Sequence, residues 1–359
     1  MNKYKICVYA IAKNEEKFVD RWYQSVKDAD KIYVLDTGST DNTVQKLKSH
    51  GVIVKTIKIN PWRFDTARNK ALEMVDEDAD ICICIDIDEV LLPNWREELE
   101  NNWDKDTTRI YYNYNWRLDE NNNPLVNFYI EKIHARHGYI WTHPVHEVLT
   151  YLNGVENKKT VPTITVNHYP DSTKSRGSYL PLLELSVKEC PEDDRNMHYL
   201  GREYMYYGMY DKCIDTLKKH LNLKSATWKD ERCASMRFIG RSYKLLKNYD
   251  EAIKWYNKAI KEAPYLRDPY VEMAILQYEL QNWNNVIYYC NEALKINDKY
   301  KSYINEIFSW DNTIYDLKSI AYYNLNDKEN ALTNINIALS FNPNDERLIN
   351  NKKFIENMK

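Results

Sequence analysis

A 34-residue periodicity in the second half of the chain constrains its fold more than any other sequence feature. Gly240 aligns with Ala274 and Ala252 aligns with Val286, each pair being separated by 34 residues. Small residues at a fixed spacing let paired helices approach closely, while aromatic side chains fill the space between them. We therefore expect everything after about residue 170 to form helical hairpins, each burying one face against the next.

The details of the repeat resemble the tetratricopeptide repeat, whose period is also 34 residues. The segment 239–264 carries IGRSY, then NYDEAI, then KAI and a closing Pro264. One further copy lies 39 residues upstream, counted from Gly201 to Gly240, and another lies 45 residues downstream, counted from Ala293 to Ala338. The resemblance implies about four hairpins with two insertions, in an all-α domain over residues 176–359. An unrelated helical bundle is the alternative.

The first half of the chain has a different periodicity, in which short apolar runs alternate with helical stretches. We expect strands over 5–11, 31–36, 51–59 and 80–87, and helices over 15–27, 42–50 and 65–76. Strand, helix and strand in this order predict an α/β layer with a largely parallel sheet. Aromatic and β-branched runs between 107 and 168 predict further strands. In such sheets ligands bind at the carboxyl ends of the strands.

Length, charge and cysteine usage exclude several classes of protein. The 359 residues suggest two domains, and a net charge of −3 argues against a nucleic-acid partner. The seven cysteines are an odd number and most lie in apolar segments, so we expect reduced thiols, with Cys82 and Cys84 in a strand rather than at a zinc ion. No apolar run approaches the roughly 18 residues of a membrane span, and the short N-terminal run lacks a cleavage site. These features predict a cytoplasmic protein.

The run Ile81-Cys-Ile-Cys-Ile-Asp-Ile-Asp-Glu is the most informative chemical motif. Side chains two apart on a strand point the same way, so Asp86 and Asp88 should lie on one face at the carboxyl end of the strand. Two close carboxylates repel each other, and binding of a divalent cation by their oxygen atoms is the simplest way to offset this repulsion. The alternative is that both residues only cap a following helix.

Polar residues also follow the earlier strands. Asn14 and Glu15 follow the first strand, Asp36 ends the second, and Asp65 and Arg68 come after the third. Acidic side chains at strand ends can accept hydrogen bonds from a base or a ribose, and an arginine neutralises phosphate. The sequence lacks G-x-G-x-x-G and G-x-x-x-x-G-K-[ST], so neither a dinucleotide-binding domain nor a P-loop is supported. A nucleotide pocket built from several loops is predicted.

The motifs AKNEE, VLDTGSTDNT, FDTARNKAL and IDIDE together resemble those of family 2 glycosyltransferases. The resemblance covers residues 4–100 well and extends more loosely to about 175. It implies an α/β GT-A (Rossmann-like) nucleotide-sugar-binding domain over residues 1–175, a UDP-sugar donor, UDP-glucose foremost, and a Mn²⁺ or Mg²⁺ ion. It also implies inversion at the anomeric carbon.

The resemblance assigns roles to residues of this sequence. Asn14, Glu15, Asp36 and Asp65 would contact the uridine, with Ala10 and Ile87 lining the nucleotide-sugar site. Arg68 would approach the ribose or the diphosphate, Asp86 the ribose or the metal through water, and Asp88 the metal directly. The residues themselves add that His168, at the end of the last predicted strand, is a second candidate metal ligand. Lys174 and Arg176 in the following loop could close over the diphosphate and exclude water.

An inverting transfer needs a base that takes the proton of the acceptor. Four histidines lie in thirteen residues between His134 and His146, just before Glu147. We predict Glu147 as the base and His146 as its neighbour or an acceptor ligand, while His134 and His137 have structural or surface roles. Asp119, followed by Glu120 in the turn LDENNNP, is the alternative base.

The acceptor is predicted from the repeats, since repeat arrays present concave surfaces that suit extended peptides. A peptide or protein is the favoured acceptor and a glycan is the alternative, and the repeats are also a candidate homodimer surface. The combination with a repeat extension is similar to the sublancin-type bacteriocin S-glycosyltransferases. A nucleotidyltransferase, and an adaptor that binds nucleotide sugars through an inactive first domain, are the rival functions.

Overall fold

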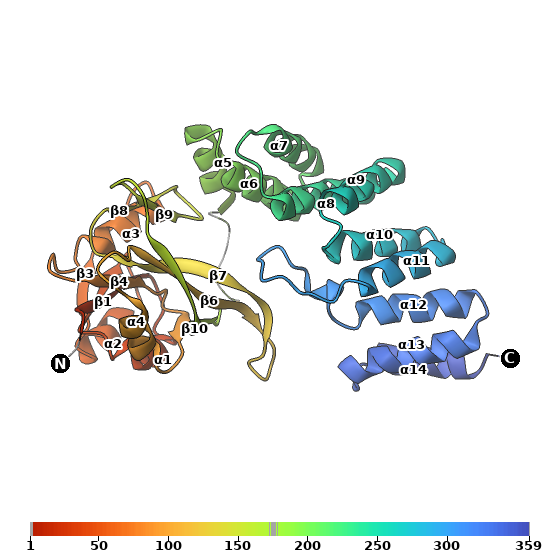
Figure 1. The fold of residues 1–359 in the computed structure, drawn as a ribbon, viewed down its shortest axis with the longest axis horizontal. Coiled ribbons are helices and arrows are strands. Elements are labelled where there is room, and N and C mark those ends of the chain that lie inside the picture. Colours follow the sequence, from red (N-terminus) through yellow and green to blue (C-terminus); the bar gives the residue numbers. More distant parts are fainter. Residues whose placement is uncertain (1–2, 172, 174–176, 178, 359) are drawn as a thin grey trace. The chain divides into compact units, whose positions relative to one another are not determined.

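The computed structural model describes residues 3–171, 173, 177 and 179–358. The chain divides into two compact units, Met1–Ser186 with Lys301–Tyr303 and Val187–Tyr300 with Ile304–Lys359. The first unit is built on a mixed sheet and the second consists of helices (Figure 1). The division falls further along the chain than residue 175, inside a helix that follows the last strand.

The first unit contains an eight-stranded sheet with the order β3-β2-β1-β4-β7-β6-β10-β5, beside the small hairpin β8-β9. Strands β1 to β4 are parallel, β7 is antiparallel to β4 and to β6, and β10 runs parallel to β6. The strands are β1 (Ile6–Ala12), β2 (Lys31–Asp36), β3 (Ile53–Thr56), β4 (Ile81–Cys84), β5 (Glu89–Leu91), β6 (Arg109–Leu118), β7 (Pro124–Ala135), β8 (Tyr139–Thr142), β9 (Val148–Tyr151) and β10 (Lys158–His168). This arrangement brings the carboxyl ends of β1, β2 and β4 to one edge.

Both faces of this sheet are buried, which explains why β1 and β4 read as continuous apolar runs. Ile6 and Val8 of β1 pack on one face with side chains of α1 (Val19–Val26), α2 (Thr43–Ser49) and α4 (Trp95–Asn102). Cys7 and Tyr9 point to the other face, where α3 (Phe64–Leu72) and the β8-β9 hairpin cover them. The prediction of an α/β layer is confirmed.

Several predicted elements are shorter in the structure than in the sequence analysis, among them the strand expected over 51–59, which is Ile53–Thr56, and the helix expected over 65–76, which ends at Leu72. Two of the differences affect the candidate site. The helix expected over 15–27 begins only at Val19, because Asn14 has a φ of +55° and its loop is bonded to the loop after β2. The strand expected over 80–87 ends at Cys84. Asp86 and Asp88 therefore lie in the turn that leads to β5, and the argument that strand alternation places them on one face was wrong.

The second unit consists of helical hairpins, as the periodicity predicts. The hairpins pair α6 with α7, α8 with α9, α10 with α11 and α12 with α13, and α14 packs on the last of them (Figure 1). The division between the units falls inside α5 (Tyr179–Glu189). The helices that follow are α6 (Asp194–Tyr206), α7 (Tyr210–Asn222), α8 (Lys229–Leu245), α9 (Tyr249–Glu262), α10 (Asp268–Glu279), α11 (Trp283–Leu294), α12 (Thr313–Asn324), α13 (Lys328–Phe341) and α14 (Glu346–Glu356). The longer insertion, between α11 and α12, contains the 3-10 turn η1 (Ile307–Ser309).

The glycines of the repeat are required by close packing within the hairpins. A Cβ atom on Gly240 in α8 would lie 2.8 Å from Cε1 of Tyr256 in α9, and one on Gly201 in α6 would collide with Leu217 in α7. Both partner side chains are buried. The expected role of small residues in the hairpins is thus confirmed at atomic detail.

We expect Gly240→Ala to lower the free energy of unfolding by about 1–3 kcal/mol, because the added methyl group must displace a rigid, buried aromatic ring. Urea unfolding followed by circular dichroism measures the change. Asn257→Ala, on the exposed face of α9, is the matched control and should not lower the unfolding midpoint, because alanine favours the helix more than asparagine does. A Gly240→Ala protein as stable as the wild type would contradict the packing argument.

The cysteines follow the prediction from the sequence. Cys82 and Cys84 lie in β4, and six of the seven thiols are buried, with only Cys190 exposed. Burial raises the pKa of the Cys84 thiol to about 11, so it stays protonated and unreactive at neutral pH. Among the helices that the structure describes, none is both long and apolar enough to cross a lipid bilayer.

Candidate active site

The loops after β1 and β2 are joined to each other by hydrogen bonds at the edge of the sheet where these two strands end. The Asn14 backbone N–H donates to Ser39 Oγ at 2.8 Å, and the Thr40 N–H donates to Asn14 Oδ1 at 2.8 Å. The Glu15 N–H donates to Thr43 Oγ1 at 2.7 Å. The two loops therefore hold Asn14 and Glu15 in fixed positions beside the end of β2.

Four other predicted nucleotide-site residues are buried at this edge. Asp36 is buried and accepts hydrogen bonds from the backbone of its own loop, at 3.1 Å from Ser39 N. Asp65 accepts a hydrogen bond from its neighbour Thr66 N at 2.6 Å and is paired with Arg63. Ala10 and Ile87 are buried in the core, at 0% and 2% exposure. Asp36 thus orders its own loop, and Asp65 orders the first turn of α3.

Asp86 is the centre of an ion-pair network. Its carboxylate pairs with Arg68 Nη1 at 2.7 Å and with Lys132 Nζ at 2.8 Å. Burial alone would raise the pKa of Asp86, but the two cations outweigh burial and hold the pKa well below its usual range. Asp86 is therefore an anion at every physiological pH.

Arg68 connects three parts of the first unit. Besides Asp86, its guanidinium pairs with Glu147, donates to Cys84 Sγ at 3.1 Å and lies 5.0 Å from the centre of the Trp141 ring. The side chain is 7% exposed. The sequence predicts that Arg68 reaches the ribose or diphosphate, whereas in the structure its guanidinium joins α3 to the end of β4 and to the loop before β9.

Lys132 and Glu89 belong to this network and were missed by the sequence analysis. Lys132 Nζ lies 2.9 Å from Glu89 Oε1, and that carboxylate also accepts hydrogen bonds from Tyr114 OH and Asp86 N, each at 2.8 Å. Burial is the main reason why the pKa of Glu89 is raised. A lysine inside the apolar β7 run FYIEKIH was the available signal, since a lysine that faces a core needs a carboxylate partner.

We expect Lys132→Met to lower the free energy of unfolding by about 3–5 kcal/mol, because it leaves the buried Glu89 without its cation. Urea unfolding measures the loss. Lys105→Met, at an exposed position, should change the free energy of unfolding by less than about 0.5 kcal/mol. Equal stability of the Lys132→Met and Lys105→Met proteins would show that the network contributes nothing.

Asp88 and His168 face each other at the same edge. His168 Nδ1 donates a hydrogen bond to the Trp116 carbonyl at 3.1 Å, and its Nε2 lies 3.5 Å from Asp88 Oδ2. Burial alone would lower the pKa of His168, but the hydrogen bond and the charge of Asp88 outweigh it and raise the pKa. The imidazole is further fixed by stacking on Trp116, at 4.5 Å between ring centres.

This pair fits a divalent cation. Metal-binding histidines usually donate their second N–H to a carbonyl or carboxylate, as His168 does, which orients the other nitrogen toward the metal. Asp88 adds an oxygen ligand whose side chain is 25% exposed, so solvent or a ligand can reach it. Two protein ligands leave several coordination positions for the oxygens of a bound phosphate.

Glu147 and His146 lie in the loop between β8 and β9. Two non-glycine residues of this loop have positive φ angles, His143 at +75° and His146 at +51°. Such conformations are uncommon and persist where the surroundings impose them, often at functional sites. Here the Phe64 N–H donates to the Pro144 carbonyl at 3.0 Å and ties the loop to α3.

The alternative base lies elsewhere in the fold. Asp119 is in the exposed turn between β6 and β7, as the sequence indicates, and accepts hydrogen bonds from Asn121 N and Asn123 N at 2.8 Å. The hydrogen bonds from Asn123 are the main reason why its pKa is lowered. Lys174 and Arg176 lie outside the described residues.

His134, expected to be structural, is buried in a hydrogen-bonded chain. Trp141 Nε1 donates to Tyr9 OH and Tyr9 OH donates to His134 Nε2, both at 2.8 Å, while His134 Nδ1 donates to the Ala135 carbonyl. Burial lowers the pKa of His134 to about 3. His137, by contrast, is 63% exposed.

This burial makes the stability of the first unit depend on pH. The unfolded chain binds a proton at His134 below about pH 6.5 and the folded chain does not, so the free energy of unfolding should fall by about 1.4 kcal/mol per pH unit between pH 6 and 4. Urea unfolding at pH 7.5, 6 and 5 measures the slope. His134→Gln should flatten the slope by this amount, and His137→Gln should leave it unchanged. Equal slopes in all three proteins would contradict the assignment.

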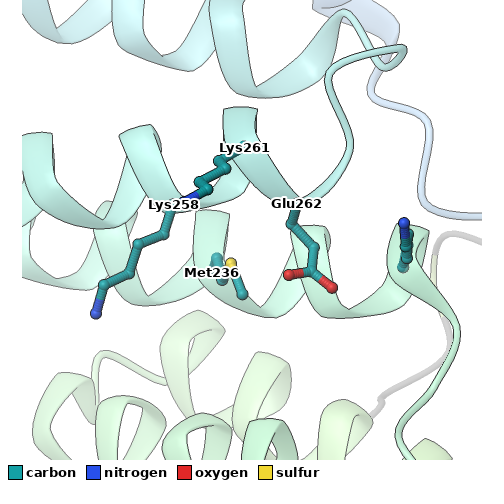
Figure 2. Close-up of a pocket in the computed structure, with 5 residues that line it drawn as sticks. Met236, Lys258, Lys261 and Glu262 are labelled. Carbon is teal, nitrogen blue, oxygen red and sulfur yellow. The ribbon is translucent and has the colours of Figure 1, made fainter.

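A shallow pocket lies in the second unit, between α8 and α9. It has a volume of about 280 Å³ and is lined by Lys229, Met236, Lys258, Lys261 and Glu262 (Figure 2). Arg232 pairs with Glu262 at 2.7 Å, and Lys258 lies 4.0 Å from the centre of the Trp255 ring. The carboxylate of this lining, Glu262, is already paired with Arg232, so we place the candidate chemistry at the sheet edge of the first unit.

Solved structures similar to this chain include tetratricopeptide repeat proteins. The similar structures include the Cut9-Hcn1 hetero-tetramer of APC/C (15% identity, 50% of this chain and 33% of that chain, TM-score 0.41) and MamA (16%, 50% and 99%, 0.38). A third is a thermophilic tetratricopeptide repeat protein of Thermus thermophilus (16%, 50% and 90%, 0.35). No curated protein sequence is a significant match.

Family models match both units of the chain. Residues 7–147 match the glycosyl transferase family 2 model, and residues 234–266 match the tetratricopeptide repeat model. The first match spans the strands β1 to β8 and ends on Glu147, so it includes Asp86, Asp88 and the network around Arg68. The chain thus carries a family 2 glycosyltransferase domain followed by tetratricopeptide repeats.

Proposed function

We propose that this protein is an inverting, metal-dependent glycosyltransferase that moves a sugar from a UDP-sugar, UDP-glucose foremost, to a peptide or protein. Family 2 enzymes use nucleotide-sugar donors and commonly a divalent cation. The observation that carries the proposal is the pair Asp88 and His168, which lies at the sheet edge where the strand-end loops converge. The narrower resemblance to sublancin-type enzymes stays a prediction.

We assign the uridine to the surface formed by the loops after β1 and β2. Asn14 and Glu15 are held there by the neighbouring loop, and Asp36 orders that loop. Asp65, in the first turn of α3, is the fourth proposed contact to the uridine. Ala10 and Ile87, being buried, would shape the site through the main chain. Lys174 and Arg176 remain the proposed residues that close over the diphosphate.

Asp88 and His168 would hold the cation, which when bound would offset the charge that develops on the departing diphosphate. Arg68 and Lys132 would not touch the cation but fix the Asp86 carboxylate through two ion pairs. The turn that carries Asp86 and Asp88 would therefore be rigid before the donor binds. Rigid, pre-oriented charge is effective because it needs no rearrangement during the reaction.

Glu147, with His146 beside it, is the proposed base toward the acceptor. Its pairing with Arg68 fixes the carboxylate at the end of the β8-β9 hairpin. Tetratricopeptide repeats are protein-interaction modules, and we assign the peptide or protein acceptor to them. A homodimer through the repeats is a secondary prediction that light scattering would test.

Thermal stabilisation by nucleotides tests the proposal most directly. A ligand that binds the folded state raises Tm by mass action. We expect UDP and one UDP-sugar to raise Tm in the presence of Mn²⁺ and to have little effect without it, while ADP and GDP have little effect in either case. If no nucleotide shifts Tm with any divalent cation, the donor proposal fails and the adaptor function becomes the better hypothesis.

A further inference from the structure

Three side chains that can ligate a metal converge in the first two repeats. Asp194 lies in the first turn of α6, His220 in the last turn of α7 and Glu231 in the first turn of α8. One ligand atom of each lies within 4.8 Å of the other two. We propose that these three residues bind a zinc ion that fastens the first helical hairpin to the second.

The hydrogen bonds of the imidazole support this assignment. Ser235 Oγ lies 3.0 Å from His220 Nδ1 and 2.7 Å from His198 Nδ1, and a hydroxyl has one proton to donate. When Ser235 donates to His198, it accepts the Nδ1 proton of His220, and the lone pair of His220 Nε2 is left for a metal. Metal-bound histidines likewise donate their second N–H to a nearby oxygen, which orients the ring.

The second ring nitrogen of His220, Nε2, is the atom that would bind the cation. Within the described part of the chain, Nε2 has no hydrogen-bond partner, although it lies 3.3 Å from Glu231 Oε1 and the His220 side chain is completely buried. A buried nitrogen without a hydrogen bond is unfavourable, and a lone pair that faces a carboxylate oxygen is more so. A metal ion between the two atoms would give the buried nitrogen a partner.

The geometry and the ligand types favour zinc. Zinc bound to nitrogen and carboxylate oxygen at about 2.0–2.1 Å in a tetrahedron places its ligand atoms about 3.4 Å apart, close to the 3.3 Å between His220 and Glu231. Asp194 is partly exposed, so its carboxylate can turn inward and admit the ion from solvent. Imidazole ligands favour zinc over magnesium. A water molecule would take the fourth position.

Such an ion would connect three successive helices. Repeat arrays depend on contacts between neighbours, so a bond between the α6-α7 hairpin and α8 would stabilise the start of the array. The site shares no residue with the pair Asp88 and His168 and needs no nucleotide. Its occupancy can therefore be measured independently of glycosyl transfer.

Metal content and Tm of the full-length protein test the proposal. The protein is treated with a chelator, dialysed, and titrated with Zn²⁺ in the absence of nucleotide. We expect one retained zinc per chain by mass spectrometry and a rise in Tm. Asp194→Asn and Glu231→Gln, which keep the side-chain shape, should each weaken zinc binding by at least about tenfold, since even outer-shell changes cost about 10–100-fold. Asp215→Asn, exposed on α7, is the control.

Zinc binding that is absent in the wild type, or equal in the Asp194→Asn, Glu231→Gln and wild-type proteins, would overturn the assignment. Because Glu231 is buried, Asp194→Asn at the partly exposed position decides the matter if the Glu231→Gln protein does not fold. Asp88→Asn should keep the zinc. A wild-type protein that retains zinc but shows no UDP-dependent shift would count against the donor proposal and not against this site.

Discussion

Asp88→Asn should reduce UDP release from the preferred UDP-sugar by about 10²–10⁴-fold, which corresponds to the several kcal/mol that a cation contributes at a departing phosphate. The amide is a weaker metal ligand than the carboxylate and leaves His168 as the remaining protein ligand of the pair. The assay measures UDP release in the absence of an acceptor, when water replaces the acceptor and the UDP-sugar is hydrolysed. The Mn²⁺-dependent rise in Tm with UDP should be lost in the same variant.

Asp106→Asn is the matched control, because Asp106 is exposed and lies away from the strand-end loops. It should release UDP at the wild-type rate. The Asp88→Asn protein should also unfold near the wild-type Tm when no nucleotide is present, since Asp88 lies in a turn and is partly exposed. Wild-type rates of UDP release from Asp88→Asn would remove the metal from the proposed mechanism.

Glu147→Gln should lower the rate of transfer by about 10²–10⁴-fold, the usual contribution of a general base, while UDP still raises Tm as in the wild type. Glutamine keeps an oxygen that can accept a hydrogen bond from Arg68, so the loop before β9 should stay in place. UDP release measures the rate, because a base aimed at the acceptor would also activate the water that replaces it.

Asp119→Asn separates the two candidate bases. Its amide oxygen can still accept the backbone hydrogen bonds that form the turn between β6 and β7, so folding should be unaffected. We expect near wild-type activity. The opposite pattern, an active Glu147→Gln protein and an inactive Asp119→Asn protein, would assign the base to Asp119 and leave Glu147 as the anchor of Arg68.

Local patterns were enough to predict most of the fold. The alternation of apolar runs placed β1, β2 and β4, and the 34-residue period gave the four helical hairpins with the close contacts at Gly201 and Gly240. Such features depend on neighbours along the chain or on one repeating length. The end of β4 at Cys84 was not predicted, because an apolar run does not show where the neighbouring strand stops pairing.

The partners of the candidate site residues were much less predictable. Nothing near Asp86 in sequence indicates that its carboxylate pairs with Lys132, which reaches it from β7 only because that strand lies next to β4. Likewise the pairing of Arg68 with Glu147 depends on the β8-β9 hairpin packing against α3. The motifs identified which residues gather at the edge, but long-range topology decides which of them are already paired.

The position of Arg68 between Asp86 and Glu147 has a consequence for how the site can change. One guanidinium holds a carboxylate on the donor side and the carboxylate proposed to face the acceptor, so neither can be replaced without altering the electrostatic environment of the other. A change of specificity at this site would therefore come more readily from loops that leave Arg68 untouched. Directed evolution of the protein should accordingly accumulate substitutions in the neighbouring loops and preserve Arg68, Asp86 and Glu147.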